Sequence, residues 1–134
     1  MHIYALADLH LSYANPKPMD IFGPCWANHG ELIRDNWRQI VSEEDVVLVP
    51  GDISWAMQLK DAKPDLDFIA SLPGKKIILR GNHDYWWNSV TQVRSSLDPS
   101  VLCIQNDCVT INGFSIGGTR MWMLPGTVRK YPLA

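Results

Sequence analysis

Short apolar runs alternate with amphipathic stretches along this chain, and polar residues follow each apolar run. Four of these runs are typical of buried strands: HIYALA (2–7), DVVLVP (45–50), KKIILR (75–80) and VLCIQ (101–105). Helices are predicted in the stretches between them, over residues 28–42, 56–72 and 88–97. Strands that alternate with helices in this way favour an α/β fold with one mainly parallel sheet and flanking helices.

The first predicted helix carries both a start signal and an apolar stripe. Asn28 is expected to cap its amino end, and Glu31, three residues later, would complete a capping box. Five apolar residues recur at helical spacing and are expected to be buried together: Leu32, Ile33, Trp37, Ile40 and Val41. These residues are therefore predicted to form one buried stripe along the helix.

Proline and glycine mark two further boundaries. Pro64 is expected to open the second piece of a helix predicted in two pieces, because proline is tolerated in a first helical turn. Asn112-Gly113 lies inside the alternating segment 108–118, and this is the strongest short signal for a β-hairpin in the chain. Neither feature introduces a linker, so residues 1–134 are expected to form a single domain.

Composition and charge narrow the possible partners. The 134 residues are 46% apolar and 19% charged, as in a globular domain, and the net charge of −2 provides no basic field for specific nucleic-acid binding. No apolar run approaches the ~20 residues of a membrane span, and residues 1–7 do not resemble a signal peptide. Cys25, Cys103 and Cys108 are expected to be reduced thiols, the last two buried. We therefore expect a cytoplasmic protein that does not bind membranes.

Three polar clusters follow the first three predicted strands. They are Asp8-Leu9-His10, Gly51-Asp52 and Gly81-Asn82-His83-Asp84. Each cluster alone is typical of a turn or a helix cap. In open α/β sheets, however, ligands bind in the crevice outside the carboxyl ends of the strands. The three clusters are therefore expected to converge on one site.

Four side chains in these clusters are predicted to bind metal: Asp8, His10, Asp52 and Asn82. Two carboxylates, an imidazole and an amide oxygen suit Mn, Fe or Zn better than Ca or a structural zinc. Because Asp52 follows the middle strand, its two oxygens could each hold one metal, at a spacing of ~3.5–4 Å. A metal pair of this kind would generate hydroxide near neutral pH and bind a phosphoryl group.

The GNHD cluster and the residue before it are also expected to act on a substrate. A cationic His83 would stabilise phosphoryl charge and protonate the leaving oxygen. Asp84 would orient the His83 ring and raise its basicity. Arg80 is either a phosphate contact or a salt-bridge partner, and Asn82 and His83 are further candidates for substrate binding.

In this order, the strings DLH (8–10), GD (51–52) and GNHD (81–84) resemble the motifs of the calcineurin-like metallophosphoesterase family. The longer strings DLHLS, GDISWAM and RGNHDYWW are similar to a bacterial, cytosolic branch of that family, and the resemblance covers about residues 1–120. It implies an αββαβ sandwich of two sheets and a site for two divalent metals. The implied roles are Asp8 and His10 on the first metal, Asp52 between the two, Asn82 on the second, and His83 as the acid.

The chain departs from the family pattern after His83. The family continues with a further histidine and a Gly-His-x-His element, whereas no histidine follows His83 here. Four ligand residues would give five contacts, since only Asp52 bridges, and two metals need about eight to twelve. We therefore expect at most one weakly bound metal, a second sheet that is largely missing, and a domain truncated at the carboxyl end. Met121, Trp122 and Met123 are expected on an incomplete core face.

Two function classes follow from these residues. The first is a metal-dependent phosphoesterase that hydrolyses a phosphomonoester or phosphodiester by metal-activated hydroxide. The alternative is a truncated, catalytically inactive fragment with at most weak single-metal binding. An unrelated nucleotide binder ranks last, because neither GxGxxG nor GxxxxGK[ST] is present. The identity of the phosphorylated substrate stays open. The place of Trp86 and Trp87 also stays open: both could belong to the core, or one of them could line the entrance of the site.

Overall fold

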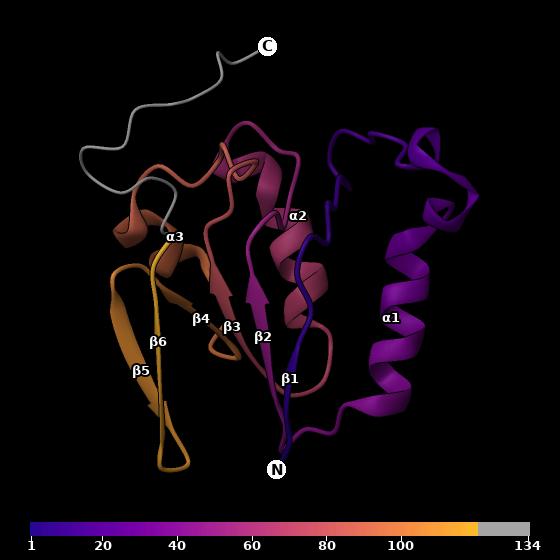
Figure 1. Ribbon diagram of the computed structural model, residues 1–134. Coiled ribbons are helices and arrows are strands. Elements are labelled where there is room, and N and C mark those ends of the chain that lie inside the picture. Colours follow the sequence, from indigo (N-terminus) through magenta and orange to yellow (C-terminus); the bar gives the residue numbers. More distant parts are fainter. Residues whose placement is uncertain (121–134) are drawn as a thin grey trace, which may run out of the picture.

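A four-stranded parallel sheet forms the centre of the protein. The computed structural model describes residues 1–120. The strands lie in the order β1-β2-β3-β4, with bounds Ile3–Ala5, Val46–Pro50, Lys75–Leu79 and Val101–Ile104. Every neighbouring pair is parallel, so the sheet follows the order of the sequence (Figure 1). All four predicted strands and the α/β class are therefore confirmed.

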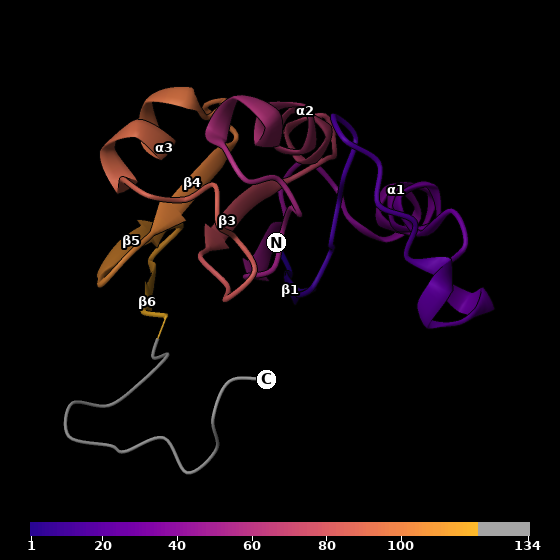
Figure 2. The ribbon, with the colours of Figure 1, turned by 90° about the horizontal axis from the view of Figure 1, so that it is seen from above.

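Three helices flank this sheet: α1 (His29–Ile40), α2 (Leu59–Ala70) and α3 (Val90–Ser96). In Figures 1 and 2, α2 and α3 lie on one side of the strands, and α1 lies beyond β1 at the edge. Trp37, Leu66 and Val93, one from each helix, belong to the same buried cluster as Val47 of the sheet. Two short 3-10 turns, η1 (Asp20–Phe22) and η2 (Pro24–Trp26), precede α1.

A β-hairpin covers the opposite face of the sheet. Its strands are β5 (Asp107–Ile111) and β6 (Phe114–Gly118), and Val109, Ile111 and Ile116 pack against the second buried cluster of the sheet. The turn residues Asn112 and Gly113 have φ angles of 50° and 83°, as a type I′ turn requires. The predicted hairpin is confirmed, and within residues 1–120 it is the only part of a second sheet.

Two predictions about the helices are wrong. Asn28 has a left-handed φ of 54° and its side chain makes no capping hydrogen bond, while Glu31 pairs with Arg34 at 2.6 Å, so no capping box forms. α2 is one continuous helix with Pro64 in its interior. Proline removes one backbone hydrogen bond there, and the buried face that includes Leu66 keeps the helix on the sheet.

The apolar stripe of α1 is only partly buried. Trp37 and Val41 are buried, whereas the side chains of Leu32 and Ile40 are 50% and 61% exposed. The physical reason is the position of α1 at the edge of the sheet, where only one side of the stripe meets β1 and the core. The predicted core residues Met121, Trp122 and Met123 lie outside the described residues.

Other buried positions resolve the remaining sequence predictions. Trp86 and Trp87 are both buried, so neither lines an entrance. Cys103 is buried as predicted, but Cys108 is exposed because it lies at an outward position of β5. In the part of the chain that the structure describes, no helix has the length and apolar character needed to cross a membrane.

Candidate metal centre

Three loops meet at the edge of the sheet where β1, β2 and β3 end, and they carry the predicted ligands (Figure 1). The backbone N–H of Asp8 donates to the Gly51 carbonyl at 3.1 Å, and that of His10 donates to the Asp52 carbonyl at 3.0 Å. The backbone N–H of His83 donates to Asp52 Oδ1 at 2.9 Å. The expected convergence of the clusters is confirmed, with Asp52 in the middle.

The backbone of the predicted ligands is strained. Asp8, His10 and Asp52 have φ angles of 59°, 45° and 51°. The other non-glycine residues at positive φ among residues 1–120 are all asparagines: Asn28, Asn106 and Asn112. A non-glycine residue at positive φ is uncommon, although Asn, Asp and His adopt this region more readily than the rest. Strain of this kind is concentrated at functional sites, and here it falls on three of the four residues predicted to bind metal.

Two glycines allow the second and third loops to approach each other. A Cβ at Gly51 would lie 2.7 Å from the Cα of Gly81, and Gly51 also has a φ of 99°. A Cβ at Gly81 would overlap the backbone nitrogen and the carboxylate of Asp52. The Gly-Asp and Gly-Asn pairs in the motifs are therefore needed so that Asp52 and Asn82 can share one site.

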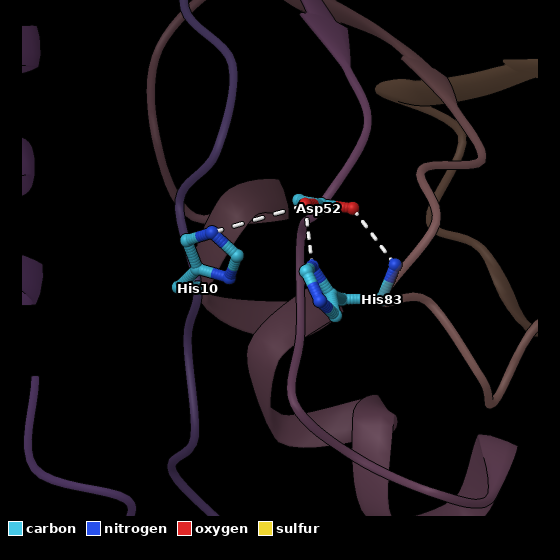
Figure 3. A group of neighbouring side chains, drawn as sticks. All are labelled: His10, Asp52 and His83. Carbon is cyan, nitrogen blue, oxygen red and sulfur yellow. Dashed lines mark hydrogen bonds and ion pairs between the residues drawn. The ribbon is translucent and has the colours of Figure 1, made fainter. Parts of the chain in front are cut away.

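A carboxylate between two imidazoles forms the centre of the site (Figure 3). Asp52 Oδ2 lies 2.9 Å from His83 Nδ1 and 3.9 Å from His10 Nε2. One ligand atom from each of these residues lies within 4.8 Å of the others, a grouping that could hold a metal ion. Asp8 is not part of this group, but it lines a cleft of about 230 Å³ together with Asp52 and Asn82.

The amide of Asn82 lies against the carboxylate of Asp52. With its NH₂ group turned toward Asp52, the amide donates to both carboxylate oxygens, each at 3.2 Å. This contact holds Asn82 beside Asp52. An amide and a carboxylate both offer oxygen donors that divalent cations accept, so these residue types fit a metal.

The electrostatics of the imidazole and the carboxylate also suit metal binding. Burial lowers the pKa of His10 in spite of the nearby Asp52 and Asp8 carboxylates, so its ring is neutral near pH 7. Its Nδ1 is buried without a hydrogen-bond partner in the described residues. Burial acts to raise the pKa of Asp52, but hydrogen bonds from His83 outweigh it and the pKa is lowered. A neutral imidazole and an ionised carboxylate are the forms that bind metals.

Asp84 is completely buried, and its contacts differ from the predicted ones. Its carboxylate accepts hydrogen bonds from Ile53 N at 2.8 Å, Ser54 N at 3.1 Å, Gly81 N at 2.7 Å and Trp86 Nε1 at 3.0 Å. Burial raises the pKa of Asp84 against these bonds. The predicted contact of Asp84 with the His83 ring is corrected, because Asp52 bonds that ring and Asp84 joins the loops that follow β2 and β3.

Sequence reasoning missed His29, the first residue of α1. Its Nε2 lies 2.9 Å from the Leu9 carbonyl and 3.2 Å from the His10 carbonyl, so it can donate to the strained backbone of a predicted ligand. The only signal was a histidine at a helix start, which is not specific. His29 is a positioning residue for the first loop.

Trp55 was also missed, although it lies within the string GDISWAM. Its ring stacks on that of His10, with centroids 4.7 Å apart and planes at 22°, and lies 5.0 Å from the His83 ring. Lys17 Nζ lies 5.3 Å from the centroid of the same indole. The indole N–H of Trp55 donates to the sulfur of Met19. Trp55 therefore fixes the orientation of His10 by stacking.

Arg80 lies at the rim of the same cleft. Its Nε is buried without a partner, and within residues 1–120 the structure gives it neither an ion pair nor a hydrogen bond. Burial and the nearby charge of Arg120 lower the pKa of Arg80, while Asp84 acts against them. Of the two roles predicted for Arg80, the contacts in this region do not support the salt bridge, and the phosphate contact stays a prediction.

A larger cavity of about 500 Å³ lies between β1 and α1. Its walls are mostly apolar, with Tyr4, Leu6 and Trp37 among them, and Asp8 and His29 also line it. Size alone would favour this cavity, but Asp52 and Asn82 line the smaller cleft together with Asp8, and His10 lies beside Asp52. We therefore place the metal centre in the smaller cleft.

A parallel sheet with carboxylate, imidazole and amide donors at its carboxyl edge defines an α/β protein with a candidate metal centre. The sequence model of the calcineurin-like phosphoesterase family matches residues 1–131. The chain belongs to this family, and the resemblance of its motifs is confirmed. At the level of the family, the match and the group of His10, Asp52 and His83 support metal-dependent phosphoester chemistry.

Individual relatives are longer proteins. The chain is similar to the Gene 66 protein of Mycobacterium phage D29, with 31% identity over 84 residues that cover 62% of this chain and 40% of the relative. It is 30% identical over 88 residues to an uncharacterized protein of Methanocaldococcus jannaschii, covering 61% of this chain and 46% of that protein. The matched regions thus span less than half the length of these curated relatives.

A solved structure shares the fold. The crystal structure of a protein of unknown function from Aquifex aeolicus matches with a TM-score of 0.53 and 21% sequence identity. The match covers 84% of this chain and 56% of that structure. At this identity the likeness concerns the arrangement of the elements alone.

Proposed function

We propose that this chain carries most of the site of a phosphoesterase that transfers the phosphoryl group of a monoester or diester to water. One observation carries the proposal. The Asp52 carboxylate lies among His10, His83 and Asn82, which three separate loops bring together. Each oxygen of this carboxylate bonds His83 once and keeps a further lone-pair direction, so the carboxylate could bridge two metals.

The proposed ligands follow from the donors present. Asp8 and His10 would hold one divalent ion, Asn82 the other, and Asp52 both. Ions of Mn, Fe or Zn bound here would supply Lewis acidity and an activated water. The neutral His10 ring and the contact between the Asn82 amide and the Asp52 carboxylate support this assignment.

His83 is proposed to act as the acid. Its Nδ1 pairs with Asp52, which leaves Nε2 as the ring nitrogen that can face a substrate, and its side chain is 37% exposed. When Nδ1–H donates to Asp52, Nε2 carries a proton only in the cationic ring. That proton passes to the leaving oxygen as its bond to phosphorus breaks and the oxygen of water becomes bonded to phosphorus.

The test is the Mn²⁺-, Fe²⁺- or Zn²⁺-dependent hydrolysis of p-nitrophenyl phosphate and its bis ester. Asp52→Asn should lower kcat/KM by about 100-fold or more, because it weakens both proposed metal contacts. Asp35→Asn is the matched control, since Asp35 is exposed on α1 and, within residues 1–120, pairs only with Arg34. If Asp52→Asn retains the wild-type rate, the bridging assignment is wrong.

A second candidate is a chain that binds one metal weakly and has no turnover. The observation in its favour is the ligand set, because no histidine follows His83 and the four proposed ligands make only five contacts. Calorimetric titration with Mn²⁺ separates the two candidates. One weak site without hydrolysis supports the second, whereas two sites with hydrolysis that Asp52→Asn abolishes support the first.

A further inference from the structure

The guanidinium of Arg80 is a cation without a matching anion in the described residues. Its Nε is buried and unpaired, and the acid nearest to it in the sequence, Asp84, already accepts four hydrogen bonds from other groups. The side chain as a whole is half-buried, so the rest of the guanidinium can meet a ligand from solvent. A group of this kind at the rim of a cleft is suited to an incoming anion.

Arg80 is shared by two adjoining clefts. The first, of about 230 Å³, is the metal cleft, which Asp8, Asp52 and Asn82 also line. The second, of about 150 Å³, is lined by Arg80, Ile104, Gln105, Asn106 and Arg120. Arg120 borders both clefts as well. The second cleft therefore has two cationic side chains and no carboxylate on its wall within residues 1–120, whereas the first has two carboxylates.

The end of β6 brings Arg120 to this position. Gly118 packs on the sheet so closely that a Cβ there would overlap Leu79 and lie 3.4 Å from Ile104 Cγ2. The carbonyl of Gly118 accepts from Asn106 N at 3.0 Å, and Thr119 Oγ1 donates to Asn106 Oδ1 at 2.5 Å. The chain thus leaves β6 at the ends of β3 and β4, and the second cleft is built by regular packing.

We propose that the second cleft is an anion subsite that receives a second phosphate group, so that the substrate is a diphosphate with one phosphate in the metal cleft and its neighbour between Arg80 and Arg120. The proposal rests on the proposed function, because a bound metal receives the first phosphate beside the carboxylates of Asp8 and Asp52. Guanidinium groups suit phosphate because their N–H donors match two oxygens at once. A monoester would leave this subsite empty, whereas a diphosphate would fill both clefts.

The reaction with such a substrate is a simple hydrolysis. The oxygen of water forms a bond to the phosphorus in the metal cleft, and the anhydride bond from that phosphorus to the bridging oxygen breaks. The bridging oxygen leaves with the phosphate in the second cleft and carries the electron pair of the broken bond. Negative charge therefore builds up beside Arg80 and Arg120, and cations at that point would stabilise the transition state.

Binding can be measured without turnover. Isothermal titration calorimetry on the chain with Mn²⁺ present would compare imidodiphosphate, orthophosphate and phosphonoacetate, which offer two phosphates, one, or a phosphonate with a carboxylate. Titration of each compound into Mn²⁺ alone provides the blank. We expect imidodiphosphate to bind at least tenfold more tightly than the other two. Arg80→Met and Arg120→Met should each weaken it by about 10- to 100-fold, the loss expected for charged hydrogen bonds. Arg38→Met, at an exposed position of α1, is the matched control and should bind like the wild type.

Three results would overturn the proposal. Equal affinity for imidodiphosphate and orthophosphate would remove the second subsite. Phosphonoacetate binding as tightly as imidodiphosphate would replace the diphosphate with a substrate that carries a carboxylate. Wild-type affinity in Arg120→Met would also overturn it, and since Arg120 is exposed, this variant stays informative even if Arg80→Met does not fold.

A kinetic comparison separates this proposal from the proposed function. With Mn²⁺, the ratio of kcat/KM for ADP to that for p-nitrophenyl phosphate should fall about tenfold in Arg120→Met. Hydrolysis of p-nitrophenyl phosphate that depends on Asp52, without selective imidodiphosphate binding, would refute the subsite alone. Selective binding without hydrolysis of any ester would refute the proposed function and support the subsite.

Discussion

Replacing Asp84 by Asn tests whether this carboxylate holds the loops together or tunes a catalytic histidine. Asn keeps the size of the side chain and one oxygen, so it can still accept from Ile53 N, Ser54 N and Trp86 Nε1. The second oxygen, which accepts from Gly81 N at 2.7 Å, becomes an amide nitrogen. Two donors then face each other in a fully buried position.

The expected loss of stability follows from these contacts. Losing one charge-assisted hydrogen bond costs about 1.5–3 kcal/mol, and a buried N–H left without a partner costs about 1–3 kcal/mol. Part of this is offset, because burial already disfavours the ionised carboxylate and raises the pKa of Asp84. We therefore expect Asp84→Asn to lower the free energy of unfolding by about 2–4 kcal/mol, or Tm by roughly 10 °C.

Urea unfolding followed by tryptophan fluorescence would measure this change, with Mn²⁺ affinity measured in parallel. The metal affinity should fall although no proposed ligand is altered, because Gly81 leads directly to Asn82. Asp35→Asn is the control and should change stability by less than about 0.5 kcal/mol. If Asp84→Asn changes the free energy of unfolding by no more than this control, the structural role is refuted. A large loss of activity without a loss of stability would instead support the predicted contact with His83.

Two further predictions concern a glycine and a buried carboxylate. Gly81→Ala should lower Mn²⁺ affinity about tenfold or more in calorimetry, because a Cβ there overlaps the loop after β2. Gly117→Ala is the control, since a Cβ there meets only ordinary contacts. Equal affinities of the two variants for Mn²⁺ would contradict the close approach of the loops. Hydrogen bonds from the backbone N–H groups of Ser42 and His2 hold the pKa of Asp45 well below its usual range. Stability from this carboxylate is present above its unfolded pKa of about 4 and is lost as the pH falls toward the folded pKa. Asp45→Asn should therefore flatten the fall of Tm between about pH 4 and pH 2, and a curve parallel to the wild type would be evidence against it.

Local patterns were enough to predict most elements and the general place of the site. The apolar runs identified all four strands because a buried parallel strand is apolar along its whole length. The position of Asp52 after the middle strand predicted its central place among the ligands. The partial burial of α1 was not predictable, because helical spacing shows which residues share a face but not how much of that face meets the sheet.

The contacts between the loops could not be predicted from the sequence. His83 and Asp84 are neighbours in the chain, so their pairing was a reasonable expectation, but consecutive side chains point apart. The carboxylate of Asp84 bonds mainly backbone N–H groups, which no residue pattern reveals. His29 reaches the first loop from α1, and nothing in its sequence surroundings distinguishes it from a surface histidine.

The sequence by itself determined the α/β class, the order of the strands along the chain and the three motifs with metal-ligand chemistry, because these depend on local periodicity and residue type. Only the tertiary structure decided which polar atoms meet. Asp52 bonds the His83 ring, Asp84 joins the loops that follow β2 and β3 through hydrogen bonds, and Arg80 lines the same cleft as Arg120. Those outcomes depend on distances between loops far apart in the chain, which the order of strands in the sheet and the close approach of Gly51 and Gly81 determine.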